Sequence, residues 1–300
     1  MVAKNIRLPN IRKMFVPDKG HTIVDADLSG ADAQVVAWEA GDEDLKAAFR
    51  SGIKIHVHNA RTMFDQCANM TDEEIKESPL YRDIKMGCHA CNYGGTVPAL
   101  VSQIGWDKKF AEEFRARWFT AHPNILEGHK RTERYLQGTQ CWNCDNLDIT
   151  LDRPCTNCGV ALGRTVKNAF GFRRVFFDRL DGQLVPQALA WVPQSTVALV
   201  TDIGWINIAH GHEYVLQTFN STALNINWKK WLCSPGAYSK WHNIVTFLLQ
   251  VHDSVVFQVP HAYESDIPDI IEDLRVRVPY DDPLFIPWGW AKSRKSWGDC

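Results

Sequence analysis

Two acidic segments far apart in the chain carry the residues best suited to catalysis. Residues 24–32 include Asp25 and Asp27, and residues 250–254 include Asp253. Each segment places an aspartate at the end of a run rich in β-branched apolar residues, where a strand leaves the core and exposes its tip. Two carboxylates brought together at such tips can hold a pair of divalent cations, which clamp the attacking and leaving oxygens of a phosphoryl transfer.

The alternative for each aspartate alone is structural, because Asp commonly caps turns and helices. Asp25 and Asp27 are two residues apart, so they share one face of the predicted strand. Spacing therefore leaves open which of them faces the second acidic segment.

A predicted helix between the acidic segments carries a second set of polar side chains. It begins at Pro79, which suits the first helical position, and Gly94 ends it. Lys85, His89 and Tyr93 are spaced by four residues and share one face. A cation followed by two rings is suited to binding a nucleoside triphosphate. An isolated pattern of this kind, however, more often belongs to an ordinary amphipathic helix. The conformational cost of a mid-helix glycine, up to about 1 kcal/mol for Gly87, favours a mobile element.

Four of the nine cysteines form the pattern in the sequence that most strongly indicates a metal-binding site. Cys141 and Cys144 are separated by ten intervening residues from a second pair, Cys155 and Cys158. Two such pairs predict a closed, tetrahedral structural zinc site, and Gly159 favours a tight turn after the second pair. Disulfides are the alternative, and a reducing compartment disfavours them.

Composition limits the class of protein. Three hundred residues suit one large or two modest domains, and no apolar run reaches the length of a membrane span. The N-terminus does not resemble a signal peptide, so we expect a cytoplasmic protein without a membrane partner. The net charge is −2, but residues 108–179 hold 13 Lys or Arg against 8 Asp or Glu, which fits either a phosphate-binding surface or a solvated helical face.

Strands separated by helical blocks, without regular βαβ alternation, favour the α+β class. We expect a strand over 21–27 and a strand, a turn and a second strand over 244–259. We expect helices over 31–49, 56–64, 107–137, 187–209 and 264–278, and another that starts at residue 72 behind a capping box at Thr71. The helix over 31–49 is interrupted at 41–43, and the helix over 107–137 is interrupted at His122–Pro123. Residues 168–177 read as a turn into a short strand, and residues 211–243 could not be assigned.

The three polar segments together resemble motifs A, B and C of the family A (DNA polymerase I type) DNA polymerases, in a form like that of phage enzymes. The resemblance implies a right-hand polymerase palm with an antiparallel sheet, helical fingers and a small zinc-knuckle insertion. It assigns residues 1–66 to the first part of the palm, 67–137 to the fingers, 138–163 to the zinc insertion and 164–300 to the second part of the palm. The implied activity is template-directed transfer of dNTPs to a primer 3′-OH, with release of pyrophosphate.

The resemblance also selects among the acidic residues. Residues 27–32 resemble the family pattern Asp-x-Ser-x-x-(Glu/Asp), which makes Asp27 a metal ligand together with the backbone carbonyl of Leu28. His252–Asp253 resembles the family's His-Asp turn, so Asp253 is the second carboxylate for two Mg²⁺ ions and His252 lies near the primer terminus. Many members have Glu where this chain has Ser254.

Nucleotide binding is implied for five residues: Asp32, Arg82, Lys85, His89 and Tyr93. Lys85 and Tyr93 match the family pattern in register, and Lys85 is the implied proton donor to pyrophosphate. The position of the family's arginine holds Tyr81, with Arg82 one residue later. Asp32 stands where members commonly have Glu, which pairs with the tyrosine to exclude a ribose 2′-OH.

Contacts to primer–template DNA are implied for Arg173, Arg174 and Gln194, in addition to His252. The family's thumb and exonuclease regions have no counterpart before residue 10. We therefore expect either a fragment or one part of a split polymerase whose N-terminal subunit carries them. Two other hypotheses stay open: an enzyme similar to reverse transcriptases, and a non-catalytic, zinc-stabilised DNA-binding remnant.

Overall fold

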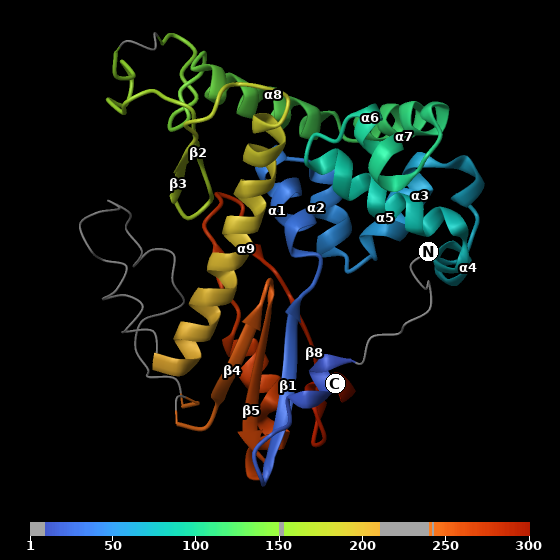
Figure 1. Ribbon diagram of the computed structural model, residues 1–300, viewed down its shortest axis with the longest axis vertical. Helices are drawn as coiled ribbons and strands as arrows, with labels where there is room; N and C mark the ends of the chain where they lie inside the picture. The colour runs from blue at the N-terminus through green and yellow to red at the C-terminus, as the bar shows by residue number, and fades with distance from the viewer. Residues whose placement is uncertain (1–9, 150–152, 211–239, 242) are drawn as a thin grey trace, which may run out of the picture. The chain divides into compact units, whose positions relative to one another are not determined.

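A computed structural model describes residues 10–149, 153–210, 240–241 and 243–300 (Figure 1). Most of the unassigned segment 211–243 lies outside these residues. The chain forms two compact units. The sheet unit comprises Met1–Ala31 and Val197–Cys300, and the helical unit comprises Asp32–Thr196. These limits differ from the palm and fingers boundaries expected from the sequence, and that assignment stays a prediction.

A four-stranded antiparallel sheet organises the sheet unit, as the α+β prediction requires. Its order is β4-β5-β1-β8, with β1 at His21–Leu28, β4 at Thr246–Val251, β5 at Ser254–Pro260 and β8 at Trp288–Ser293. The strand, turn and strand expected over 244–259 are confirmed as β4 and β5. Strand β8 was not predicted, because its short, glycine-containing and largely exposed sequence has no buried alternating pattern.

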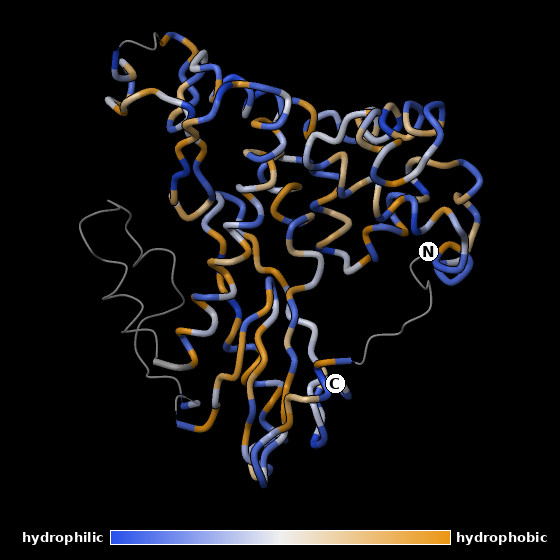
Figure 2. The backbone as a smooth tube through the Cα atoms, viewed as in Figure 1, coloured by the Kyte–Doolittle hydropathy of each residue, from blue (hydrophilic) through white to orange (hydrophobic). Residues whose placement is uncertain are grey.

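The two faces of this sheet are buried by different partners, as the alternation of side chains requires. On one face, Val24 of β1 and Phe257 of β5 belong to an apolar cluster with Ile208 of α9 (Leu184–His210) and Ile270 of α11 (Ile267–Asp273). On the other face, Ile23 and Val256 pack with Trp297. Figure 2 shows hydrophobic residues concentrated along these strands. Asp25 and Asp27 follow Ile23 at spacings of two, so they belong to the face of Trp297.

The segment after β5 differs from the single helix that the sequence predicted there. A single helix over 264–278 was predicted, but the structure has a 3₁₀ segment η5 at His261–Asp266, the short α11, and strand β6 at Arg277–Val278 paired with β7 at Leu284–Phe285. Pro268 lies in the first turn of α11, where it is tolerated and sets the start of the helix.

Helices dominate the helical unit and follow the predicted pattern closely. Their bounds are α1 Ala31–Ala40, α2 Glu43–Arg50, α3 Ile55–Met63, α4 Asp72–Glu77, α5 Pro79–Asn92, α6 Val97–Ala99, α7 Lys108–Ala121 and α8 Pro123–Gln137. The capping box at Thr71 is confirmed, with both reciprocal hydrogen bonds to Glu74. Short helical turns lie at Asp65–Cys67 (η2) and Leu100–Ile104 (η3). Among the described residues, no helix is both long enough and apolar enough to span a bilayer.

Close packing, rather than mobility, accounts for Gly87 in α5. A Cβ atom built at this position would lie 2.5 Å from ring atoms of both Phe114 and Trp106. The buried face of α5 therefore needs a residue without a side chain where α7 and its aromatic cluster approach. The opposite face of the helix carries Lys85 and His89, both exposed.

A small hairpin follows the cysteine-rich insertion. Strands β2 (Thr165–Lys167) and β3 (Arg173–Val175) pair antiparallel. The turn between them is held by Asn168, whose side-chain oxygen accepts from the amides of Phe170 and Phe172 at 3.1 and 3.0 Å. Strand β3 falls within the segment predicted as a turn and strand, and β2 was not predicted.

Candidate functional site

Backbone pairing brings the two acidic segments together. In the sheet, Asp27 is the register partner of Ser254. Strands β4 and β5 are joined by the two residues His252 and Asp253, and His252 has a left-handed φ of 54°. The amide of Leu28 donates to the carbonyl oxygen of Asp253 at 3.1 Å. Asp27 and Asp253 thus lie at the same end of neighbouring strands.

The electrostatics of Asp27 show that the two carboxylates interact. Partial burial raises the pKa of Asp27 to about 6, with further contributions from the negative charge of Asp253 and that of Asp25. A hydrogen bond with the Asp253 side chain acts in the same direction, and Arg12 opposes it. Such a pair resists full ionisation until a cation neutralises it, so its chemistry fits a divalent metal. Leu28, whose carbonyl the resemblance implied as a third ligand, is the residue whose amide bonds to Asp253.

Asp25 has a different set of partners from Asp27. Its Oδ2 accepts a hydrogen bond from Nε1 of Trp297 at 2.7 Å, and Arg12 lies 3.8 Å from the same oxygen. These contacts fasten the C-terminal segment to β1. The choice that spacing left open is thus decided by the fold, in which Asp27 is the one at the β4–β5 turn.

Helix α5 presents its predicted polar face. Arg82, Lys85 and His89 are exposed at spacings of three and four, so they lie on one side of the helix. The His89 and Tyr93 rings meet edge to face with centroids 4.8 Å apart. Gly94, with a φ of 76°, ends the helix as expected.

Tyr93 is paired with Asp32, as the resemblance implied. Its hydroxyl donates to the carboxylate of Asp32, which lies in the first turn of α1. Burial, and then the nearby carboxylate, raise the pKa of the phenol above its ordinary range. Tyr93 therefore keeps its proton and holds Asp32 in place.

His56 lies close to this face of α5, and the sequence reasoning missed it. It lies in α3, and its ring meets that of Tyr81 edge to face at 6.0 Å. Burial, and then the charges of Lys85 and His89, lower the pKa of His56 to about 4. Its Nδ1 is buried and has no hydrogen-bond partner in the described part of the chain. A lone histidine in the sequence carries no pattern that could have indicated this placement.

The four cysteines of the insertion form one cluster, as predicted. All four sulfur atoms lie within 4.8 Å of one another. Sγ of Cys141 is 3.7 Å from that of Cys158, and Sγ of Cys144 is 3.6 Å from that of Cys155. Four thiolates around one zinc ion stand about 3.8 Å apart, whereas a disulfide needs about 2.05 Å. The cluster therefore fits zinc and not a pair of disulfides.

Backbone amides favour the thiolate form in the second half of this cluster. Burial opposes ionisation of Cys155, but the amides of Cys158 and Asn157, together with hydrogen bonds from the Cys141 and Cys144 thiols, lower the pKa of the Cys155 thiol to about 6. The amide of Val160 likewise lowers the pKa of Cys158. Thiolates are the form in which cysteine binds metal.

The residues expected to contact DNA lie on exposed positions. Arg173 and Arg174 are exposed on β3, and Gln194 is exposed on α9. The arginine-bearing turn is anchored by a hydrogen bond of 3.0 Å from Nδ2 of Asn168 to Oγ of Ser195, beside Gln194. Figure 1 marks β3 and α9.

Sequence similarity to known proteins is found in the first half of the chain. The sequence model described as "DNA polymerase family A" matches residues 3–143. The thermostable DNA polymerase I of Thermus filiformis is 33% identical over 122 residues, which are 41% of this chain and 14% of that protein. A DNA polymerase of Bacillus phage SP02 is 31% identical over 122 residues, 39% of this chain and 18% of that one. The matched part is thus less than a fifth of either relative.

Comparison of folds extends over nearly the whole chain. The POL domain of Pol1 from M. smegmatis, solved with DNA primer–template and dNTP, aligns with a TM-score of 0.67 at 17% identity. The alignment covers 98% of this chain and 43% of that one. The α+β architecture is accordingly that of a polymerase domain. The sequence similarity to DNA polymerase family A thus covers residues 3–143, just under half of the chain, and the similarity of fold extends over nearly all of it.

Proposed function

We propose that this chain is the catalytic core of a template-directed DNA polymerase, which adds dNTPs to a primer 3′-OH and releases pyrophosphate. The observation that carries the proposal is the carboxylate pair formed by Asp27 at the end of β1 and Asp253 in the β4–β5 turn. Asp27 has its pKa raised towards neutrality by burial and by Asp253, as two carboxylates that share a cation site do in the absence of the cation. The family match and the polymerase fold support it.

In this proposal Asp27, Asp253 and the carbonyl of Leu28 hold two Mg²⁺ ions. When bound there, the ions would activate the 3′-OH and neutralise the triphosphate. The chain's own contribution is positional, because phosphoryl transfer depends on placement and charge more than on covalent chemistry. The rigid β-ladder supplies that placement, and the β4–β5 turn exposes His252 towards the primer end.

The exposed face of α5 is proposed to bind the incoming nucleotide. Arg82 and Lys85 supply positive charge for the phosphates, and Lys85 is the proton donor to pyrophosphate. His56 adds an imidazole near Lys85 that protonates more readily once anionic phosphates lie beside it. Tyr93 and Asp32 form the surface that selects the sugar.

The remaining assignments follow the same reasoning. The Cys141, Cys144, Cys155 and Cys158 cluster is proposed to hold a structural zinc ion, because a closed set of four thiolates leaves no position for substrate. Gln194, Arg173 and Arg174 are proposed to contact primer–template DNA. A subunit that carries a thumb or exonuclease remains a proposal.

Primer extension with Mg²⁺ and four dNTPs tests the proposed activity. The native chain is compared with Asp27→Asn, Asp253→Asn and, as a matched control, Asp281→Asn, which changes an exposed carboxylate of the sheet unit. We expect extension by the native chain and the control, and a loss of about 10³-fold or more in the other two variants. Parallel assays on RNA and DNA templates distinguish a DNA-templated polymerase from an enzyme similar to reverse transcriptases, which would also extend on RNA.

A second measurement tests the metal site even if the chain needs a partner subunit to extend a primer. Binding of Mn²⁺, followed by electron paramagnetic resonance, should weaken in Asp27→Asn and Asp253→Asn but not in Asp281→Asn. Equal DNA binding with and without Mg²⁺, no extension and no carboxylate-dependent Mn²⁺ binding would instead identify a non-catalytic DNA-binding remnant.

A further inference from the structure

The cysteine insertion consists of two turns with the same backbone pattern. In the first, the amide of Asp145 donates to the carbonyl of Cys141 at 2.9 Å, and in the second the amide of Gly159 donates to the carbonyl of Cys155 at 2.8 Å. Asp145 and Gly159 both have left-handed φ values, 61° and 73°. Glycine adopts this conformation freely, whereas an aspartate needs contacts that compensate its cost.

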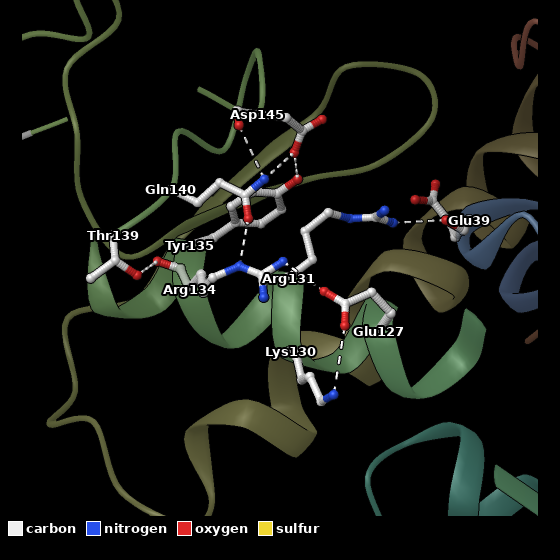
Figure 3. A network of polar contacts seen from close by, with 9 residues as sticks. All are labelled: Glu39, Glu127, Lys130, Arg131, Arg134, Tyr135, Thr139, Gln140 and Asp145. Atoms are coloured by element: carbon white, nitrogen blue, oxygen red, sulfur yellow. Dashed lines mark hydrogen bonds and ion pairs between the residues drawn. The ribbon is translucent and has the colours of Figure 1, made fainter. Parts of the chain in front are cut away.

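Those contacts attach the first turn to α8. Figure 3 shows the hydroxyl of Tyr135 donating to the carboxylate of Asp145, and Nε2 of Gln140 donating to the same carboxylate at 3.1 Å. Nε of Arg134 in turn donates to Oε1 of Gln140 at 2.8 Å. The first turn is therefore fixed to α8 of the helical unit.

The same turn also contacts the β2–β3 hairpin. Nζ of Lys167 donates to the side-chain oxygen of Asn143 at 3.0 Å and lies 3.3 Å from its carbonyl oxygen. The guanidinium of Arg173 lies 5.6 Å from the ring centroid of Trp142. Trp142 is buried and its Nε1 donates to the carbonyl of Ala161 at 3.2 Å, which holds the ring in place.

The hairpin needs such support because of its charge. Residues 163–177 contain four Lys or Arg and no Asp or Glu. Lys167 and Arg173 are direct partners across the two strands, an arrangement that destabilises a hairpin because like charges face each other. Oxygens of Asn143 for Lys167, and the Trp142 ring for Arg173, offset this repulsion. What remains is a strand with Arg173 and Arg174 exposed at successive positions, where the guanidinium of Arg174 lies 4.6 Å from the ring centroid of Phe176.

We propose that the zinc knuckle, formed by the two turns at residues 141–145 and 155–159, holds the β2–β3 hairpin as a contact for the sugar–phosphate backbone of duplex nucleic acid. This inference rests on the proposed function, in which the ligand is a primer–template. We infer nucleic acid as the ligand from charge complementarity. A cationic strand on a hairpin that carries no carboxylate suits binding of the phosphates. Zinc then controls DNA affinity without touching the nucleotide site.

Fluorescence anisotropy of a labelled primer–template duplex tests the proposal, without Mg²⁺ or dNTPs. The zinc-loaded chain is compared with Cys155→Ser and with Cys300→Ser, the same change at an exposed cysteine of the sheet unit. Metal analysis follows zinc content. We expect Cys155→Ser to lose zinc and to raise the Kd roughly ten- to thirtyfold near physiological salt, with a salt slope smaller by about 0.9 for each lost phosphate contact. Loss of zinc with an unchanged Kd and slope would overturn the proposal.

A double substitution distinguishes support of the hairpin from general unfolding. In a chain carrying Arg173→Gln and Arg174→Gln, the further change Cys155→Ser should have little additional effect on the Kd, because the contacts it disturbs are already absent. A further tenfold loss there would show that the knuckle acts elsewhere and would contradict the inference. Absence of primer extension at saturating DNA, together with absence of carboxylate-dependent Mn²⁺ binding, would refute the proposed function and leave this comparison of Kd values intact.

Discussion

The amide of Leu28 donates to the carbonyl oxygen of Asp253 at 3.1 Å, and this one hydrogen bond joins the end of β1 to the β4–β5 turn. The neighbouring register pair is Asp27 with Ser254. The spacing of the two carboxylates is thus set by backbone pairing, which does not depend on their side chains. Substitutions at Asp27 or Asp253 should therefore change function much more than folding.

The contrast between Asp25 and Asp27 gives the sharpest prediction. Asp27→Asn should lower kcat by about 10³-fold or more, because it removes a proposed metal ligand. Asp25→Asn should keep kcat within about tenfold of the native value and lower the free energy of unfolding by about 1 kcal/mol, because it weakens the hydrogen bond from Trp297. Single-turnover extension and urea denaturation of both variants check this.

Trp297→Phe is the matched change on the other side of that bond. It should lower stability in the same way as Asp25→Asn, and the two effects should be non-additive when combined. If Asp25→Asn were as inactive as Asp27→Asn, the assignment of Asp25 to a structural role would be wrong.

The pair of Tyr93 and Asp32 predicts how the sugar is selected. Asp32→Ala should increase the relative kcat/KM for ribonucleotides by about ten- to a hundredfold, because it opens the space that the paired carboxylate and phenol fill. Asp32→Glu, which restores the family's usual residue, should keep the discrimination. The measurement is the ratio of kcat/KM values for a dNTP and its rNTP; an unchanged ratio in Asp32→Ala would remove this pair from sugar selection.

Two glycines in helices predict opposite results for the same substitution. Gly87→Ala should destabilise the chain by roughly 1–3 kcal/mol, because the added methyl group would lie 2.5 Å from the rings of Phe114 and Trp106. Gly128→Ala in α8 meets nothing within 4 Å and should stabilise it by up to about 1 kcal/mol. Denaturant titrations of both variants suffice, and equal shifts would contradict the packing argument for Gly87.

A charged cluster at the edge of the sheet predicts acid sensitivity. Hydrogen bonds first from Lys292 and then from Arg294 lower the pKa of Glu264 to about 2, and Thr22 donates to it at 3.1 Å. Because the folded-state pKa lies below the unfolded one, this contribution to stability is full above about pH 5 and is lost as the pH falls towards 2.

The free energy of unfolding, measured at about pH 6 and pH 3, should therefore fall more for the native chain than for Glu264→Gln. The variant lacks a group that titrates at this position, so it serves as the control. A parallel decrease in both proteins would mean that other groups dominate the acid response.

Local signals in the sequence predicted much of this protein. The capping box at Thr71, Pro79 at the start of α5 and Gly94 at its end depend only on neighbouring residues, and all three occur as expected. The two Cys-x-x-Cys pairs belong to the same class, because each short turn positions its own sulfur atoms. The resemblance to family A polymerases likewise rested on contiguous motifs.

Tertiary structure decided what depends on residues distant in sequence. Asp25 and Asp27 are equivalent by spacing, and the packing of Trp297 and the register of β5 distinguish them. His56 joins the face of α5 only because α3 packs against that helix, and Gly87 is required only because two rings from elsewhere approach it. Strand β8 forms because β1 offers it an edge to pair with, since its own residues carry no strand pattern.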